Sequence, residues 1–378
     1  MLRKNPGFTA VAVLTLALGI GMNTAMFSVA NTVLVKSFPY PDPERIVMFQ
    51  NKYKGGRTGS ASPTGFNWWR QQTQAFEDVS AYDFSVANLT GESFPEQIST
   101  MDVSADFFQL CGVNALNGRT FTAADDLPNA PKRLVLAYGF WQRNFGGDPQ
   151  VIGRRISLNG ERYEIIGVLG PYFQNGQIAE RSSLSGDIET YEPPDVYIPF
   201  QLDPYSSSHG HYFNVAGRLK PGVTIADANA RLQASYQEYG RRWPDDFSPD
   251  TGFGVQGWQD AIVGGVQNSL LMLLGAVGLV LLIACANVAN LVLARATTRK
   301  REIAIRGALG AGRGRIARQL LTESVMLSFA GGVLGLAAGY AGIHAILSLI
   351  PGNIPRIGGG GSNLSLDWRV LAFVASTP

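Results

Sequence analysis

The sequence has 378 residues, a formal net charge of +2 and only 16% charged residues. Ordinary soluble domains carry about 25% charged residues, so part of this chain is unusually apolar, and a net charge this small does not indicate a nucleic-acid partner. The length allows two or three domains. Cys111 and Cys285 are the only cysteines, so the sequence offers neither a disulfide framework nor a cysteine metal site.

The first long uncharged segment covers residues 5–35 and follows two basic residues, Arg3 and Lys4. A signal peptide has an apolar stretch of about 7–15 residues before a small-residue cleavage site, and Ser28-Val29-Ala30 could serve as that site. The apolar stretch is longer than this, however, and about 20 apolar residues suffice to span a membrane. Residues 1–36 are therefore predicted to form an uncleaved transmembrane helix with a short cytoplasmic N-terminus.

Residues 37–260 contain no further run of this kind, which predicts one α+β domain outside the cytoplasm, inserted between the first and second transmembrane helices. Ser62-Pro63 is typical of a helix start, and Asn159-Gly160 between two apolar runs predicts a β-hairpin. Thr224 is placed to cap another helix. The residues expected to face the core from these helices and the chain beside them are Phe66, Trp69, Phe76, Ile225, Ala228, Leu232, Tyr236 and Tyr239. Strands are expected at 134–137, 156–158, 163–168, 195–200 and 213–219, and surface loops at 172–190 and 201–210.

Two more transmembrane helices are predicted, at residues 261–294 and 321–350, because both segments are long and apolar. The connection between them, residues 295–320, has Glu302 as its only acid. Its basic residues are Arg295, Arg299, Lys300, Arg301, Arg306, Arg313, Arg315 and Arg318. Because short basic loops stay in the cytoplasm, the pair is predicted to form a membrane hairpin with a cytoplasmic tip.

Glycines recur at every fourth position in the last of these helices, at Gly331, Gly335 and Gly339. Residues four apart share one face of a helix, and small residues on such a face let membrane helices approach closely. The spacing favours a close helix–helix contact over a smooth face toward lipid. The first helix carries a comparable row, formed by Ala17, Gly21 and Ala25.

Residues 351–378 are expected to form an outside loop followed by the start of a truncated fourth transmembrane helix. The loop contains four consecutive glycines, Gly358 to Gly361, and the apolar run 370–375 stops after a few residues. We therefore expect the sequence to be a fragment of a longer permease.

No motif for catalysis or cofactor binding is found. Residues 307–315 are rich in glycine but lack the Gly-Lys-Ser/Thr sequence that holds phosphates. His209 and His211 have no set of cysteine or acidic ligands nearby in the sequence, so a solvated loop is favoured over a metal site. No Gly-x-Ser-x-Gly elbow indicates a serine hydrolase. The predicted protein has no catalytic, cofactor-binding or metal-binding residues.

Two acidic pairs and one histidine complete the titratable residues of interest. Asp125-Asp126 and Asp245-Asp246 are adjacent acidic pairs in turn-like sequences, and such pairs are expected to be solvated surface residues. His344 lies within a predicted transmembrane helix. Ionisable residues at that depth are functional candidates, although a helix-packing or interfacial role is favoured.

Short motifs spread over nearly the whole chain carry a family resemblance. They are Asn5–Ala10 with Leu18–Gly21, Asn31–Pro41, Val103-Ser104 with Phe107-Phe108, Gly118-Arg119 with Phe121, Phe140–Arg143 with Phe145–Asp148, Ile152-Gly153 with Leu158–Gly160, Gly217–Gly222, Cys285–Leu291, Arg301–Arg306 and Ala308–Ala311. In this order they resemble the MacB/FtsX-type ABC transporter permeases, in particular the large duplicated acidobacterial permeases.

The resemblance implies four transmembrane helices per unit, a large periplasmic domain after the first, and an ABC-type ATPase subunit docked in the cytoplasm. It also implies a bacterial inner membrane and a second permease unit, as a homodimer or a duplicated half. Carried onto this sequence, the ATPase contact lies at 299–318. The residues assigned to it are Arg299, Arg301, Glu302, Ile303, Arg306, Leu309 and Arg313. A basic loop lying on anionic lipid headgroups is the simpler alternative.

The expected function is that of a non-catalytic permease subunit, which passes ATP-driven motion from the ATPase to the periplasmic domain for efflux or mechanical work. A membrane-tethered binding or signalling module without ATPase coupling is the alternative. A tethered extracytoplasmic enzyme is a third possibility, but no group of residues in the sequence supports it.

Overall fold

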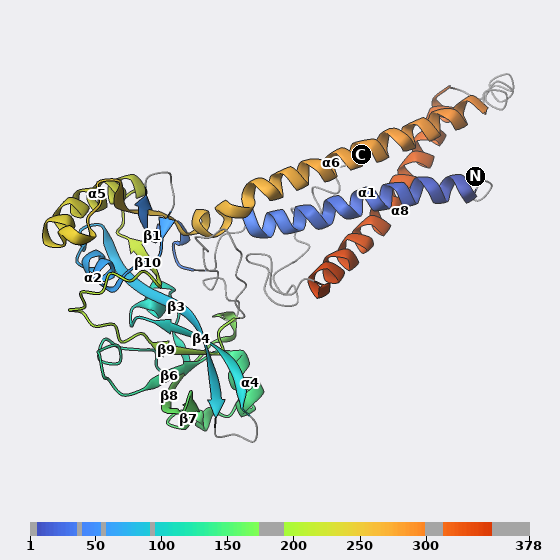
Figure 1. The fold of residues 1–378 in the computed structure, drawn as a ribbon. Coiled ribbons are helices and arrows are strands. Elements are labelled where there is room, and N and C mark those ends of the chain that lie inside the picture. Colours follow the sequence, from blue (N-terminus) through green and yellow to red (C-terminus); the bar gives the residue numbers. More distant parts are fainter. Residues whose placement is uncertain are drawn as a thin grey trace. The chain divides into compact units, whose positions relative to one another are not determined.

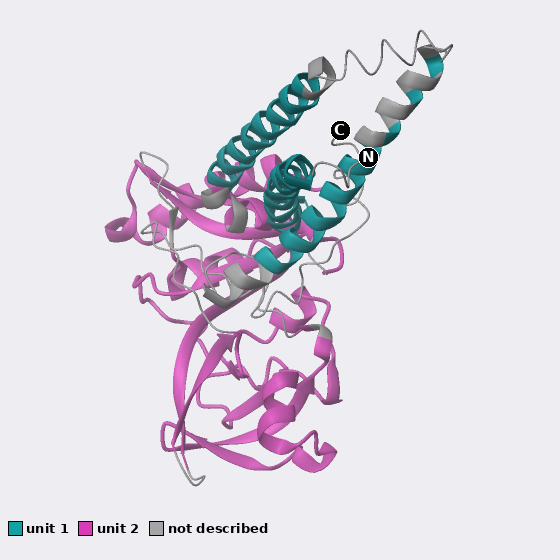
Figure 2. Ribbon diagram, turned by 90° about the vertical axis from the view of Figure 1, so that its right-hand side faces the viewer, with its two compact units in different colours: residues 1–36, 266–378 teal, residues 37–265 magenta. Residues whose placement is uncertain are grey.

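The computed structural model describes residues 6–35, 40–53, 58–90, 95–173, 193–298 and 313–349 (Figure 1). The chain divides into two compact units, residues 1–36 with 266–378, and residues 37–265 (Figure 2). The first unit holds long helices and the second is an α+β domain. The expected outside loop and fourth-helix start at 351–378, and most of the expected loop at 172–190, lie outside the described residues.

The described part of the first unit consists of three helices, one of which, α6, begins in the second unit. They are α1 (Pro6–Ala30, extended by a π-helical turn, Asn31–Val35), α6 (Trp258–Thr298) and α8 (Arg313–Leu349). Each contains a stretch long and apolar enough to cross a membrane, namely Pro6–Val35, Gln267–Ala294 and Val325–Gly342. Helix α8 begins eight residues before the boundary at 321 drawn from the sequence, since Arg, Ala, Gln and Leu are all good helix formers.

In the described part of the domain, 11 strands form one mixed sheet, nine of them in the order β11-β1-β10-β3-β4-β9-β6-β8-β5, with β2 and β7 beside this path. The strands are β1 (Ile46–Tyr53), β2 (Thr58–Gly59), β3 (Phe76–Thr90), β4 (Glu96–Val103), β5 (Ala115–Gly118), β6 (Arg133–Leu136), β7 (Arg155–Leu158), β8 (Glu161–Leu169), β9 (Val196–Pro199), β10 (Asn214–Leu219) and β11 (Thr251–Gly257). The helices are α2 (Pro63–Arg70), α3 (Phe107–Leu110), α4 (Tyr138–Phe145) and α5 (Ile225–Arg242).

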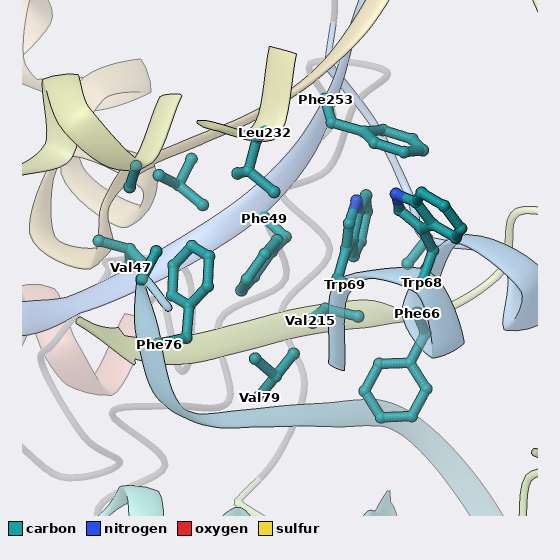
Figure 3. Packing of buried hydrophobic residues seen from close by; sticks show 14 of the residues in the cluster. Val47, Phe49, Phe66, Trp68, Trp69, Phe76, Val79, Val215, Leu232 and Phe253 are labelled. Atoms are coloured by element: carbon teal, nitrogen blue, oxygen red, sulfur yellow. The ribbon is translucent and has the colours of Figure 1, made fainter. Parts of the chain in front are cut away.

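Two hydrophobic cores form along this sheet. The first core lies where α2 and α5 cover β1, β10, β11 and the start of β3, around Trp69 and Leu232 (Figure 3). The second core joins the far end of β3 to β4, β6, β7, β8, β9 and α4, around Leu134 and Phe140. Because β3 is 15 residues long, it contributes side chains to both cores and connects them.

Several sequence predictions for the domain are confirmed. The Ser62 hydroxyl accepts a hydrogen bond from Gly65 N and caps α2. The hairpin turn has φ of 51° at Asn159 and 84° at Gly160, as a type I′ turn requires. Thr224 and Asp227 form a reciprocal capping box at the start of α5. The predicted core residues are buried, with Ile225 partly so.

Candidate functional site: the contacts of the membrane helices

The three glycines of α8 lie against α1 and leave no room for side chains. A Cβ atom built on Gly331 would lie 2.8 Å from the Cβ of Leu16, and one on Gly335 would lie 2.9 Å from the Cβ of Ile20. One on Gly339 would lie 2.9 Å from a main-chain oxygen of α1. Real Cβ atoms do not approach other heavy atoms this closely, so an alanine at any of the three positions would push the helices or their side chains apart. The two helices therefore pack backbone to backbone.

The facing surface of α1 is equally small. A Cβ on Gly21 would lie 3.0 Å from the carbonyl oxygen of Gly335, and the oxygen of Ala17 lies close to the same glycine. By contrast, Gly332 points away from α1, and a Cβ there would meet nothing within 4 Å. The close contact is thus confined to one face of α8.

Helix α1 also contacts α6, through an adjoining face that shares Leu16 and Ile20 with the α8 contact. Leu16, Ile20 and Leu281 form a small apolar cluster between the two helices. The buried side chain of Asn23 donates hydrogen bonds of 3.0 Å to Gly19 O within α1 and to Val277 O of α6. An interhelical hydrogen bond of this kind contributes roughly 1 kcal/mol inside a membrane. Helix α1 thus contacts both of the other two helices (Figure 1).

Six of the seven residues predicted to contact an ATPase lie outside the described residues: Arg299, Arg301, Glu302, Ile303, Arg306 and Leu309. The seventh, Arg313, is the first residue of α8. Helix α6 continues past its apolar stretch to Thr298. The apolar stretch of α8 begins at Val325, twelve residues after the start of that helix. The predicted contact segment is therefore flanked on both sides by helices that extend beyond their apolar stretches. The side chain of His344 also lies outside the described residues.

The expectation that Asp125 is a solvated surface residue is wrong. Its side chain is fully buried and accepts hydrogen bonds from Arg119 (2.6 and 3.2 Å), from Thr122 N (2.8 Å) and Oγ1 (2.7 Å), and from Arg133. Burial would raise the pKa of this carboxyl, but the hydrogen bonds outweigh it and lower the pKa. Its neighbour Asp126 accepts from the main-chain nitrogens of Ala105 and Gln201. Through these hydrogen bonds, Asp125 and Asp126 hold the neighbouring loops in place on the domain.

His209 and His211 lie in the expected loop, His209 partly exposed and His211 exposed, and both side chains also have partners in the domain. Nδ1 of His209 lies 2.9 Å from Asp246 Oδ2, and Tyr239 donates its hydroxyl to the same oxygen at 2.6 Å. Nδ1 of His211 lies 3.2 Å from Asn51 Nδ2. Both histidines tie the segment between β9 and β10 to the first core. Within the described part of the chain, no group of three or more His, Cys, Asp or Glu side chains is arranged to hold a metal.

Long apolar helices that enclose an inserted α+β domain in the sequence define a multi-pass membrane protein with a large domain outside the bilayer. The profile of the MacB-like periplasmic core domain matches residues 9–235, and that of the FtsX-like permease C-terminal region matches 274–374. The first match covers more than half of the chain. The chain belongs to the family of MacB/FtsX-type ABC transporter permeases, and its α+β domain is a MacB-like periplasmic core domain.

Curated relatives are permeases or proteins that combine a permease with an ATP-binding region. The chain is 29% identical over 246 residues to the uncharacterised ABC transporter permease YknZ of Bacillus subtilis, covering 64% of this chain and 56% of that protein. It is 30% identical over 242 residues to the pyoverdine export ATP-binding/permease protein PvdT of Pseudomonas aeruginosa (62% and 33%). It is 27% identical over 255 residues to the macrolide export ATP-binding/permease protein MacB of Chromobacterium violaceum (66% and 36%). The matched regions span about a third to just over half of these relatives.

Solved structures that resemble the chain are isolated extramembrane regions. The periplasmic region of MacB from Actinobacillus actinomycetemcomitans matches with a TM-score of 0.41 and 12% identity, covering 59% of this chain and 93% of that one. The extracellular domain of the YknZ transporter from Gram-positive bacteria matches with a TM-score of 0.38 and 13% identity, covering 56% and 99%.

Proposed function

We propose that this protein is the permease subunit of an ABC transporter and passes ATP-driven motion from a partner ATPase to its periplasmic domain. The observation that supports this most directly is that α6 and α8 continue as helices up to residues 299–312 from both sides. A shift imposed on that segment would therefore be carried along two stiff elements. Because α1 packs on both, motion of either helix would reach α1, which precedes the domain in the chain.

ATP binding and hydrolysis are assigned to the partner, as a separate subunit or a fused region. The names of PvdT and MacB pair a permease with an ATP-binding region, which supports an ATPase partner here. A second permease unit, as a homodimer or a duplicated half, completes the proposed assembly in the bacterial inner membrane. The same names describe export, so efflux or mechanical work in the periplasm is proposed rather than uptake.

The ATPase contact is proposed to comprise Arg299–Arg318, with Ile303 and Leu309 as its apolar anchors. These two residues are close enough in the sequence to lie on one short amphipathic helix, which can dock in a groove of a partner. Replacing both with Asp is expected to abolish ATPase recruitment while leaving the membrane helices folded, because an apolar groove does not accept two carboxylates. The measurement is a pull-down of the full-length protein in mild detergent, followed by an ATPase assay of the eluate.

Two matched controls separate the outcomes. The exchange Ile303→Leu with Leu309→Ile keeps the apolar anchors and is expected to retain the ATPase. Neutralising Arg299 and Arg306 with Gln tests the lipid alternative, since it weakens attraction to anionic headgroups but keeps the anchors. Undiminished ATPase in the double-Asp eluate would refute the contact. An eluate of the wild type without ATPase would favour a tethered binding module instead.

A further inference from the structure

The chain segment that follows α1, residues 40–45, is fixed to the domain by two arginines. Arg45 donates from Nε (2.9 Å) and Nη2 (2.5 Å) to the carbonyl oxygen of Leu219, and its Nη2 also pairs with Glu77 at 2.7 Å. Arg218 donates from Nη1 to the carbonyl oxygen of Pro41 at 2.7 Å. The place where the chain enters the domain is therefore held by side chains at the end of β10 and the beginning of β1.

Arg218 has an unusual environment for a charged side chain. It is 7% exposed and lies in β10. Its second terminal nitrogen donates to the carbonyl oxygen of Leu110, at the end of α3, at 2.6 Å. The hydrogen bonds described for it all end on main-chain carbonyls of two segments that are far apart in the sequence. A buried charge is costly, and here it links the entry segment to α3.

Gly112 also joins the entry segment to the chain after α3, because its lack of a side chain leaves room for Pro41. It lies two residues after α3 with φ of +65°, a conformation that favours glycine. A Cβ at this position would lie 2.6 Å from Cδ of Pro41 and nearer still to its Cγ. The Pro41 ring therefore rests directly on the backbone at Gly112. Pro41 is therefore held both by its close contact with Gly112 and by the hydrogen bond from Arg218.

The other end of α3 is connected to the start of α6 by contacts between aromatic rings. The ring of Phe107 lies 5.9 Å from that of Tyr82, which stacks on Trp258 at 5.9 Å with an angle of 26° between the planes. Tyr82 and Trp258 are both completely or almost completely buried. Trp258 is the first residue of α6. Helix α3 is thus connected, through one aromatic stack and one arginine, to both points where the domain joins the membrane helices in the chain.

We propose that Arg218 and Gly112 are positioning residues of a clamp, formed with α3, which transmits motion from the chain after α1 and from the start of α6 into the sheet. The clamp rests on the proposed function, because it needs an ATPase-driven motion to transmit. It requires that loosening Pro41 uncouple the domain from the membrane helices without unfolding the domain or releasing the ATPase.

Gly112→Ala and Gly146→Ala form a matched pair. Gly146 has φ of +61° and open space around its Cβ position, so both variants carry the strain of positive φ, but only Gly112→Ala displaces Pro41. Arg218→Met removes both donating nitrogens and keeps an unbranched apolar stem, whereas Arg218→Lys keeps one donor and should retain part of the response. Thermal unfolding shows which variants fold, and Arg218→Lys provides the test where Arg218→Met does not fold.

The measurement is hydrogen–deuterium exchange of the full chain in nanodiscs of phosphatidylethanolamine and phosphatidylglycerol, with the ATPase recovered by the pull-down, in the absence of nucleotide and with ADP–vanadate. The wild type and Gly146→Ala are expected to show a nucleotide-dependent change of exchange at 40–46 and 107–112. Gly112→Ala and Arg218→Met are expected to keep ATPase stimulation and to lose the change at 107–112. A retained change in these two variants, or equal loss in Gly146→Ala, would overturn the clamp. A wild type that neither stimulates the ATPase nor responds to nucleotide would instead overturn the proposed function.

Discussion

Among the described carboxylates of the domain, Asp102 has a position that is unfavourable to its charge. It lies in β4 directly opposite Asp83 of β3, and like charges facing each other across strands are destabilising. Burial, and next the charge of Asp83, raise the pKa of Asp102 to about 6. Its pKa in the unfolded chain is about 3.9. Between these values the folded protein binds more protons than the unfolded one.

The contribution of Asp102 to the free energy of unfolding should therefore be fully present below pH 4. It should be lost as the pH rises to about 6, and the loss is at most about 3 kcal/mol. Asp102→Asn removes the charge and is expected to raise the melting temperature at pH 7.5 and to change it little at pH 4. Thermal unfolding of both proteins at the two pH values measures this, with the exposed Glu238 changed to Gln as the control. Equal destabilisation at both pH values would contradict it.

Single residues also show where short-range sequence patterns are insufficient. Asp125 was expected at the surface because adjacent acidic residues usually are, yet it is buried. The signal that identifies it is Arg119 together with Thr122, since both are within reach of one carboxylate in a tight loop. Arg133 of β6 also donates to Asp125. The sequence separation of the two residues does not predict this contact. Local capping motifs, by contrast, were predictable because all their atoms lie within four residues.

At the scale of elements, the spacing of the α8 glycines indicates that they share a face but not which helix they meet. That information lies in α1, more than 300 residues away in the sequence. Strand β11 was missed for a related reason. Its glycines weaken the local preference for a strand, but a Cβ on Gly254 would lie 2.2 Å from Cε of Lys52 in β1 and 2.7 Å from Asn229 Oδ1 of α5. The glycines are explained by a tertiary contact, which local propensity does not contain.

The glycine contact can be tested with two substitutions on the same helix. Gly335→Ala is expected to destabilise the packing of α1 on α8 by roughly 1–3 kcal/mol because its Cβ would overlap Ile20. Gly332→Ala has open space and should be neutral or slightly stabilising, since both variants gain the helix propensity of alanine. Melting temperatures of the full-length protein in detergent compare the two, and equal values would show that the contact is not close.

At the scale of the whole molecule, the mixture of strands and helices predicted an α+β domain and the apolar runs predicted the membrane helices. The strand order was not predictable, because β10 lies between β1 and β3 and is supplied by a segment far along the chain. The sheet therefore needs residues 46–257 together. Since β3 contributes to both cores, we expect them to unfold in one step.

An isolated domain of residues 40–265 can test this cooperativity. Trp68 and Trp69 lie in the first core and Trp141 in the second, so variants that keep only one of these sets report on each core separately. In each variant, denaturant unfolding followed by tryptophan fluorescence and by far-UV circular dichroism is expected to give the same midpoint with both probes, as in two-state unfolding. Different midpoints would show that the two cores are separate folding units.

The pairing of β1 with β11 has a consequence for how such a protein is assembled from parts. Val47 lies opposite Gly257 in the ladder, so the chain enters and leaves the domain about one strand spacing apart, roughly 5 Å. A domain whose two ends lie this close together can be inserted, exchanged or deleted with little effect on the rest of the chain. A short linker between Val47 and Gly257 would then close the gap left in the chain, and different periplasmic specificities could be carried by one set of membrane helices.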